Sequence, residues 1–297
     1  MEILQQVSAA IGEIAAKVGP SVVGIGNRWG LGSGVVLETG KVLTNAHNLR
    51  SDEVTVTFHD GRTAKARAIG VDGDGDLAVL GVDTDDAPAL GWAGENGSVD
   101  LGAPVFALSN PGGRGLRVTL GFVSGTQRSF RGPRGRRITG SLEHTAPLLP
   151  GSSGGPVVDA GGRLLGLNTN RLGEGFYLAI PANEDLHRQV EALSRGESPS
   201  RPMLGVAIAP PEVARRLRRA VGLPEAQGVL VRQVEEDSAA AGAGVKQGDL
   251  LVEVAGRPVD SIDRLHEAIA SWDGTSSLEL KVLRGAEEHT LSTGAEQ

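Results

Sequence analysis

Apolar residues recur at two different spacings along the chain. Residues 2–18 place Ile3, Val7, Ile11, Ile14 and Val18 at helical spacing, and the Gly19-Pro20 pair ends that run. From there to about residue 182 the apolar runs are short, rich in Val, Leu and Ile, and bounded by Gly, Asp or Asn. No helical segment alternates with them, so the pattern predicts a mainly antiparallel barrel or sandwich and not a sheet of βαβ units.

A polar stretch with two prolines, SRGESPSRP at 194–202, is typical of a linker and divides the chain. It follows a predicted helix over 183–193, with Asn183 as the N-cap. We therefore expect a first domain at 1–193, a linker at 194–202 and a second domain at 203–297. In the second domain the pattern predicts strands at 203–209, 229–234, 250–254 and 277–283, and helices at 212–220 and 262–271.

Composition narrows the class of protein. Glycine supplies 44 of 297 residues, about twice its usual share of ~7 %, whereas aromatic residues make only 3 %. The glycines keep no three-residue period, which excludes collagen, and an interior glycine costs a helix about 1 kcal/mol, which disfavours a helix bundle. The hydrophobic share of 39 % excludes wholesale disorder.

Charge and cysteine content exclude several functions. The net charge is −7, so we expect no nucleic-acid partner, and the five arginines within 128–137 are read as a solvated surface loop. The absence of cysteine removes disulfides and a Cys nucleophile. No apolar run could span a bilayer and no signal peptide is visible, so we expect a soluble protein, cytoplasmic as written.

The segment most informative about chemistry is PGSSGGP at 150–156. A serine hydroxyl becomes a nucleophile when a base takes its proton and nearby N–H groups bind the resulting oxyanion, and glycines let the backbone aim those groups. Alone, such a cluster is more often an ordinary loop. It also fits the nucleophile elbow of α/β-hydrolases, but that motif needs a helix directly afterwards, and here strand and turn follow.

Two further residues stand upstream in a suggestive order. His47 ends the strand KVL, and Asp76 opens the strand DLAVLGV. Taken alone, His47 is interpreted as an ordinary turn histidine, and Asp76 as the last residue of an acidic turn at 72–76. That turn resembles part of a calcium loop, but Leu77 stands where the loop needs glycine, so we expect no metal and no cofactor. With Ser153, the order His, Asp, Ser is that of chymotrypsin-like enzymes.

The motifs GSGVVL, TNAH, DLAVL, SNPGG, GFVSG and PGSSGGPVVD resemble those of the HtrA/Deg family of serine proteases, in register from about Val18 to Leu291. The resemblance implies two six-stranded antiparallel β-barrels with the active site between them, followed by an α+β PDZ domain. It implies His47 as general base, Asp76 as the residue that orients it, and Ser153 as nucleophile. The N–H groups of Gly151 and Ser153 would form the oxyanion hole.

The implied activity is endopeptidase cleavage of unfolded or misfolded proteins through an acyl-enzyme, in a homotrimer, more often in the periplasm or cell envelope. Leu148, Asn168 and Thr169 are expected to line a specificity pocket for small or medium aliphatic side chains. The chain departs from the family pattern in four places. The segment before the nucleophile carries Thr145, Pro147 and Ser152, His47 is followed by Asn48-Leu49 where the family has aliphatics, the arginine-rich loop stands at the family's activation loop, and residues 1–20 contain no aromatic.

In the second domain the resemblance implies capture of apolar C-terminal peptides. Leu204, Gly205 and Val206 would form the loop that binds the carboxylate, and the apolar pocket would be lined by Val206, Ile208, Leu265 and Ile269. These aliphatics are also what an ordinary core needs. An alternative function is a proteolytically silent chaperone or peptide-binding scaffold, although an intact His47, Asp76 and Ser153 set argues against it.

Overall fold

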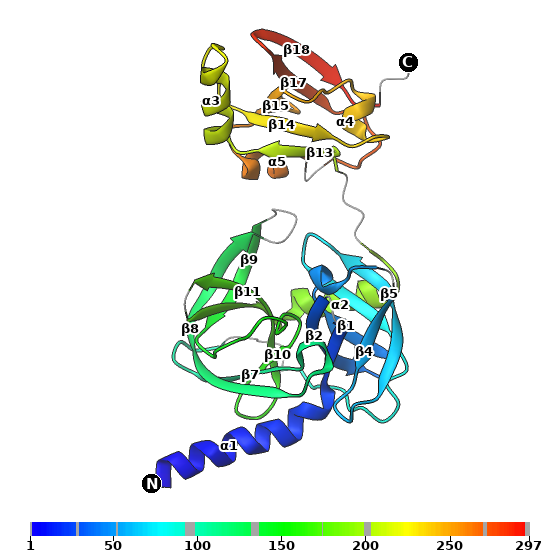
Figure 1. Ribbon diagram of the computed structural model, residues 1–297, viewed down its shortest axis with the longest axis vertical. Coiled ribbons are helices and arrows are strands. Elements are labelled where there is room, and N and C mark those ends of the chain that lie inside the picture. Colours follow the sequence, from blue (N-terminus) through cyan, green and yellow to red (C-terminus); the bar gives the residue numbers. More distant parts are fainter. Residues whose placement is uncertain are drawn as a thin grey trace. The chain divides into compact units, whose positions relative to one another are not determined.

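Two closed β-barrels, each of six antiparallel strands, make up most of the first part of the chain (Figure 1). The computed structural model describes residues 2–27, 30–51, 53–92, 99–131, 137–173, 175–198, 203–269 and 272–294. The chain divides into two compact units, Met1–Pro199 and Ser200–Gln297, which are described separately. The tip of the arginine-rich segment, 132–136, lies outside the described residues.

The strand order is β1-β2-β3-β6-β5-β4 in the first barrel and β10-β11-β12-β9-β8-β7 in the second. The expected pair of antiparallel six-stranded barrels is thus confirmed. The first barrel consists of β1 (Val22–Asn27), β2 (Gly30–Glu38), β3 (Lys41–Thr44), β4 (Glu53–Thr57), β5 (Thr63–Asp72) and β6 (Leu77–Gly81). The second consists of β7 (Pro104–Ser109), β8 (Arg117–Arg131), β9 (Arg137–His144), β10 (Pro156–Val158), β11 (Leu164–Gly173) and β12 (Phe176–Pro181).

One buried apolar cluster joins the two barrels. It contains Val35 and Leu43 of the first barrel together with Phe106 and Leu108 of the second, and Leu186 of helix α2. Each barrel also has a smaller apolar cluster of its own. Burial of apolar surface therefore holds the barrels against each other, not only the strands within each.

Two predicted helices flank the barrels. Helix α1 (Glu2–Val18) buries only its last turns, at Ile14 and Val18. Helix α2 (Glu184–Ser194) begins as predicted after Asn183, whose side-chain oxygen accepts a hydrogen bond from the N–H of Leu186 at 3.0 Å. Within the described part of the chain, no helix combines the length and the apolar character that a membrane crossing requires.

In its described residues, the second unit is a six-stranded sheet with three helices. The sheet runs in the order β13-β14-β15-β17-β18, with β16 paired to β15, so that β13 is an edge strand. The strands are β13 (Val206–Ala209), β14 (Val229–Val234), β15 (Leu250–Val254), β16 (Arg257–Pro258), β17 (Glu279–Arg284) and β18 (Glu287–Ser292), and the helices are α3 (Pro211–Ala220), α4 (Ala239–Gly242) and α5 (Ile262–Ile269). The sequence pattern missed β16, β18 and α4, because β18 is a mostly polar edge strand and the other two are only two and four residues long.

The barrels approach each other closely where β1 passes the turn η3 (Pro111–Gly113), which follows β7. A Cβ atom on Gly24 would lie 2.0 Å from the backbone nitrogen of Gly113 and 2.6 Å from the carbonyl oxygen of Asn110. Both neighbours are backbone atoms, which cannot rotate away as a side chain can. Position 24 therefore admits only glycine.

His144, the last residue of β9, is fully buried inside the second barrel. Its ring stacks on Tyr177 with the ring centres 5.8 Å apart, and its Nε2 lies 2.9 Å from Oδ1 of Asn168. Nδ1 is buried and has no hydrogen-bond partner among the residues that the structure describes. Burial lowers the pKa of His144 from 6.5 to about 4, a shift that the hydrogen bond to Asn168 opposes.

Replacing Gly24 by Ala should destabilise the first unit by about 3 kcal/mol, because the added methyl group overlaps backbone of the other barrel. The measurement is the free energy of unfolding in urea. Gly91→Ala is the matched control, since a Cβ atom there would meet nothing within 4 Å. Equal stability of the two variants would contradict the close approach at Gly24.

His144 should make the fold sensitive to acid. Because its folded-state pKa lies below the ordinary 6.5, the unfolded chain binds the proton first, and the free energy of unfolding falls as the pH drops from 6.5 to about 4. Across that pH range the parent should lose on the order of 3 kcal/mol of its free energy of unfolding, and His144→Gln should not show this loss. Urea denaturation at about pH 7 and about pH 4.5 measures this change.

The exposed His59 provides the control, since His59→Gln should keep the pH dependence of the parent. If His144→Gln loses as much stability on acidification as the parent does, then burial of the neutral imidazole does not cause the acid sensitivity.

Candidate active site

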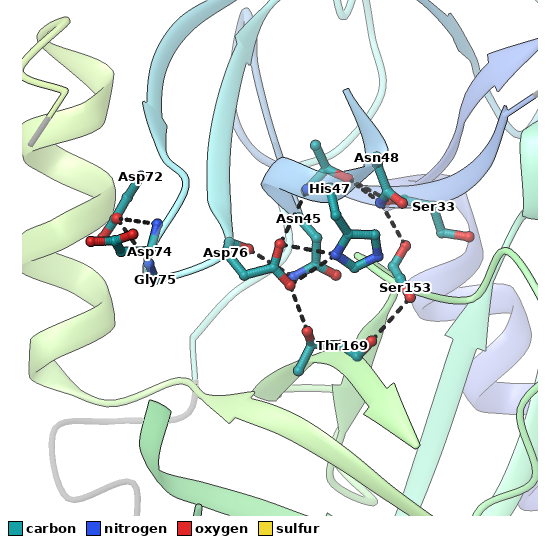
Figure 2. A network of polar contacts seen from close by, with 11 residues as sticks. Ser33, Asn45, His47, Asn48, Asp72, Asp74, Gly75, Asp76, Ser153 and Thr169 are labelled. Carbon is teal, nitrogen blue, oxygen red and sulfur yellow. Dashed lines mark hydrogen bonds and ion pairs between the residues drawn. The ribbon is translucent and has the colours of Figure 1, made fainter. Parts of the chain in front are cut away.

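Polar side chains from three loops meet where the barrels join (Figure 2). His47 lies in the 3-10 turn η2 (Ala46–Asn48), which follows β3, and Asp76 directly precedes β6. Ser153 belongs to the second barrel and lies in the loop before β10. His47 hydrogen-bonds to Asp76, and Thr169 contacts both Asp76 and Ser153, so the structure gathers all three predicted residues.

The carboxylate of Asp76 is completely buried and fully hydrogen-bonded. Its Oδ1 accepts from the backbone N–H of His47 at 3.1 Å, both carboxylate oxygens lie 2.9 Å from Nδ1 of the same ring, and Oδ2 accepts from the hydroxyl of Thr169 at 2.7 Å. An ionised carboxylate can only accept, so Nδ1 of His47 carries the hydrogen. Its Nε2 is then left with a lone pair able to take a proton.

The acidic turn before β6 aims this carboxylate. Oδ1 of Asp72 accepts hydrogen bonds from the N–H groups of Asp74 and Gly75, at 3.0 and 2.8 Å. Asp76 then adopts a left-handed backbone conformation, with φ of 57°, and its carbonyl accepts from Nδ2 of Asn45 at 2.9 Å. Among the described residues, no three His, Asp or Glu side chains gather in a way that would hold a metal ion.

Glycine is required throughout the loop around Ser153. Gly151 and Gly154 have φ values of 89° and 85°, in the left-handed region that side chains disfavour. A Cβ atom on Gly154 would lie 2.1 Å from the carbonyl oxygen of Ser33, and one on Gly155 would lie 2.2 Å from that of Leu108. The loop therefore packs directly against backbone of both barrels.

Two backbone N–H groups of this loop, those of Gly151 and Ser153, donate to no protein acceptor within the described ranges. The N–H of Ser152 instead donates to the carbonyl of Leu149 at 3.1 Å, and that of Gly155 donates to the carbonyl of Ser152 at 3.0 Å. The turn thus satisfies its other donors and leaves two N–H groups available beside the hydroxyl of Ser153. Such a pair can bind an oxyanion.

The hydroxyl of Ser153 donates to the carbonyl oxygen of Thr169 at 3.1 Å. In the described part of the chain it makes no hydrogen bond to His47, although the imidazole lies between Asp76 and Ser153 (Figure 2). A proton transfer from this hydroxyl to Nε2 of His47 would therefore need a shift of one of the two side chains. Contacts of this kind are often loose in unliganded sites.

The residues predicted for a specificity pocket are placed differently from one another. Leu148 lines a cavity of about 270 Å³ beside Ser152, whereas Asn168 and Thr169 are not part of its wall. Asn168 is fully buried, and its Nδ2 donates to the carbonyl of Gly155 at 3.0 Å. Thr169 uses its hydroxyl on Asp76. The specificity role of these three residues stays a prediction.

Sequence reasoning missed several contacts that shape the site. Ser33 and Asn45 lie within the motifs GSGVVL and TNAH but were given no role, and Asn48 was noted only as a departure from the family pattern. The structure gives each of them a hydrogen bond to the backbone of Asp76 or of the Ser153 loop. Such contacts use carbonyl acceptors that every residue has, so residue identity does not reveal them.

In the second unit, the residues predicted to bind peptide gather around one apolar cluster. Leu204 and Leu265 are buried in it, and Val206, Ile208 and Ile269 are partly buried and pack against it. Val206 and Ile208 belong to the edge strand β13. The arrangement agrees with either a core or a pocket wall, and the peptide-binding role stays a prediction.

Comparison with known proteins identifies both units. Residues 32–167 match the trypsin-like peptidase domain, and residues 202–294 match the PDZ domain. A probable periplasmic serine endoprotease, DegP-like, of Halomonas elongata is 35 % identical over 274 residues, which cover 89 % of this chain and 56 % of that protein. Serine protease Do-like HtrA of Bacillus subtilis is 28 % identical, covering 98 % of this chain and 73 % of the other. This chain thus spans little more than half the length of its Halomonas relative.

Solved structures show the same arrangement of strands. The HtrA-type protease AlgW with a decapeptide has a TM-score of 0.62 and 26 % identity, covering 95 % of this chain and 97 % of that one. The serine endoprotease from Yersinia pestis has a TM-score of 0.61 and 27 % identity, covering 95 % and 96 %. Both domains match in the order that the motifs predicted, and the chain belongs to the HtrA family of serine proteases.

Proposed function

We propose that this chain is a serine endopeptidase in which Ser153 is the nucleophile, His47 the general base and Asp76 the residue that orients the base. The observation that carries the proposal is the buried carboxylate of Asp76, which accepts the Nδ1 hydrogen of His47 and so fixes the orientation of the ring. The unprotonated Nε2 is left on the side of Ser153. That tautomer is the one a serine nucleophile requires.

The reaction begins when the hydroxyl of Ser153 turns from the carbonyl of Thr169 to Nε2 of His47. As its oxygen attacks a peptide carbonyl, the hydroxyl proton passes to Nε2, and the carboxylate of Asp76 stabilises the imidazolium. The N–H groups of Gly151 and Ser153 receive the oxyanion, each contributing about 3–4 kcal/mol in comparable enzymes. The imidazolium then gives its proton to the leaving amine, and water hydrolyses the acyl-enzyme by the same steps.

The PDZ unit would capture peptides by adding a strand to the open edge of β13. Gly205 precedes that strand with φ of 74°, and a Cβ atom there would lie 2.2 Å from the side chain of Ser238. The backbone can therefore curl tightly at this position, as a loop that binds a terminal carboxylate must. The apolar side chains of Val206, Ile208 and Ile269 would then receive the last side chain of the peptide.

Substrate class, assembly and compartment follow from the family. We propose unfolded or misfolded proteins as substrates and a homotrimer as the assembly. The relatives from Halomonas elongata and Marinomonas are named periplasmic, which favours that compartment over the cytoplasm for this chain.

A second candidate function is a peptide-binding scaffold without proteolysis. One observation favours it, namely the hydrogen bond from the hydroxyl of Ser153 to Thr169 instead of to His47. The scaffold would share every domain contact with the protease and would lack only the reactivity of Ser153.

Ser153→Ala should lower casein cleavage by at least about a thousandfold, because no other group can form the acyl-enzyme. A fluorophosphonate probe should label the parent and leave the variant unlabelled. Ser51→Ala, at an exposed serine, is the control and should behave as the parent does. A parent that binds peptides but neither labels nor cleaves would establish the scaffold function instead.

Ile269→Lys should weaken binding of a labelled peptide with an apolar C-terminus by at least about tenfold, because it places a charge in the proposed apolar pocket. Fluorescence anisotropy measures the affinity. Glu267→Lys, at an exposed position of α5, is the matched control and should change affinity little. The same peptide with an amidated C-terminus should bind weakly, and equal binding of acid and amide would exclude a carboxylate site.

A further inference from the structure

We propose that Asn48 positions the Ser153 loop by donating a hydrogen bond from the first barrel to the carbonyl oxygen of Ser153. The inference rests on the proposed role of Ser153 as nucleophile and adds a residue that no catalytic motif marks. Asn48 touches no reacting atom, so it acts through Ser153 as a positioning residue.

The carbonyl oxygen of Ser153 accepts two hydrogen bonds, both from the first barrel. Nδ2 of Asn48 donates at 2.9 Å, and the backbone N–H of Ser33 donates at 2.9 Å (Figure 2). These two bonds occupy both lone pairs of the oxygen. The main chain at the nucleophile is thereby fixed to a barrel other than its own.

The orientation of the Asn48 side chain follows from its second donor. The same Nδ2 also donates to Oγ1 of Thr44 at 2.9 Å, and the hydroxyl hydrogen of Thr44 is already used on the carbonyl of Ser33 at 2.7 Å. If the amide were turned over, Oδ1 would face two oxygens with no hydrogen to share. Only the orientation with Nδ2 toward these oxygens supplies them with hydrogens.

The site leaves space for this side chain by means of two glycines, one in each barrel. A Cβ atom on Gly32 would lie 2.4 Å from Cγ of Asn48, and one on Gly154 would lie 3.0 Å from its Nδ2. The carboxamide therefore fills a slot between β2 and the Ser153 loop. Larger residues on either side would push it out.

A second contact from the first barrel holds the other end of the loop. Oγ of Ser33 donates to the carbonyl of Gly151 at 2.9 Å and accepts from the N–H of Asn110 at 3.0 Å. The carbonyls held in this way belong to Gly151 and Ser153, the residues whose N–H groups are proposed to bind the oxyanion. Two torsions link the N–H and C=O of each residue, so holding the carbonyl limits where the N–H points.

Loss of these hydrogen bonds should destabilise the transition state more than the bound substrate, because the oxyanion forms only during the reaction. Asn48 also follows His47 within the turn η2. A single turn would then carry the base and fix the nucleophile it serves.

The test uses the full chain with two substitutions, Asn48→Leu, which keeps the size but loses both donors, and Asn48→Asp, which replaces donors with acceptors. On a fluorogenic peptide that the parent cleaves, Asn48→Leu should lower kcat about tenfold and Asn48→Asp further, with KM within about twofold. Affinity for a peptide boronic acid, whose adduct with serine is tetrahedral, should fall by the same factor. Affinity for the product peptide should not change.

Asn183→Ala is the control for lost stability, because it removes the cap of α2 without contacting the Ser153 loop. It should lower the thermal midpoint and leave kcat per folded molecule unchanged. Parental kcat and boronate affinity in Asn48→Leu, or a loss confined to KM or to the folded fraction, would overturn the positioning role alone. A parent that neither labels at Ser153 nor cleaves would overturn the proposed function and this inference with it.

Discussion

The buried carboxylate of Asp76 is the charge around which the first unit is arranged. A negative charge without exposure to water is tolerated only when donors surround it, and here they come from both barrels, from His47 on one side and Thr169 on the other. If one donor were lost, the charge would remain buried and partly uncompensated. The apolar cluster that the barrels share packs together the two halves from which these donors come.

The contact between the barrels depends on the absence of side chains as much as on their presence. At Gly24 and Gly154 the nearest atom across the contact is a backbone atom, closer than any Cβ atom allows. The close approach brings the Ser153 loop within reach of Ser33 and Asn48. Much of the glycine excess in the composition serves turns, but these few glycines set the distance between the two halves of the site.

The fold class could be predicted because strand periodicity and the order of motifs are properties of the sequence itself. The meeting of His47, Asp76 and Ser153 was predicted from that order. The secondary contacts were not, because the acceptors of Ser33 and Asn48 are carbonyl groups that carry no residue identity. Thr169 was expected to line a pocket, and the sequence did not indicate that its hydroxyl donates to Asp76, because that contact depends on how the two barrels pack together.

The division of the site between barrels also bears on how this chain can change over evolutionary time. His47 and Asp76 belong to one barrel and Ser153 to the other, so neither barrel contains the whole proposed site by itself. Substitutions at strand positions away from the contact between the barrels alter the stability of one barrel and can accumulate almost independently. Substitutions at the contact change the distance between the two barrels and hence the geometry of the site. Such substitutions should therefore be the last to accumulate.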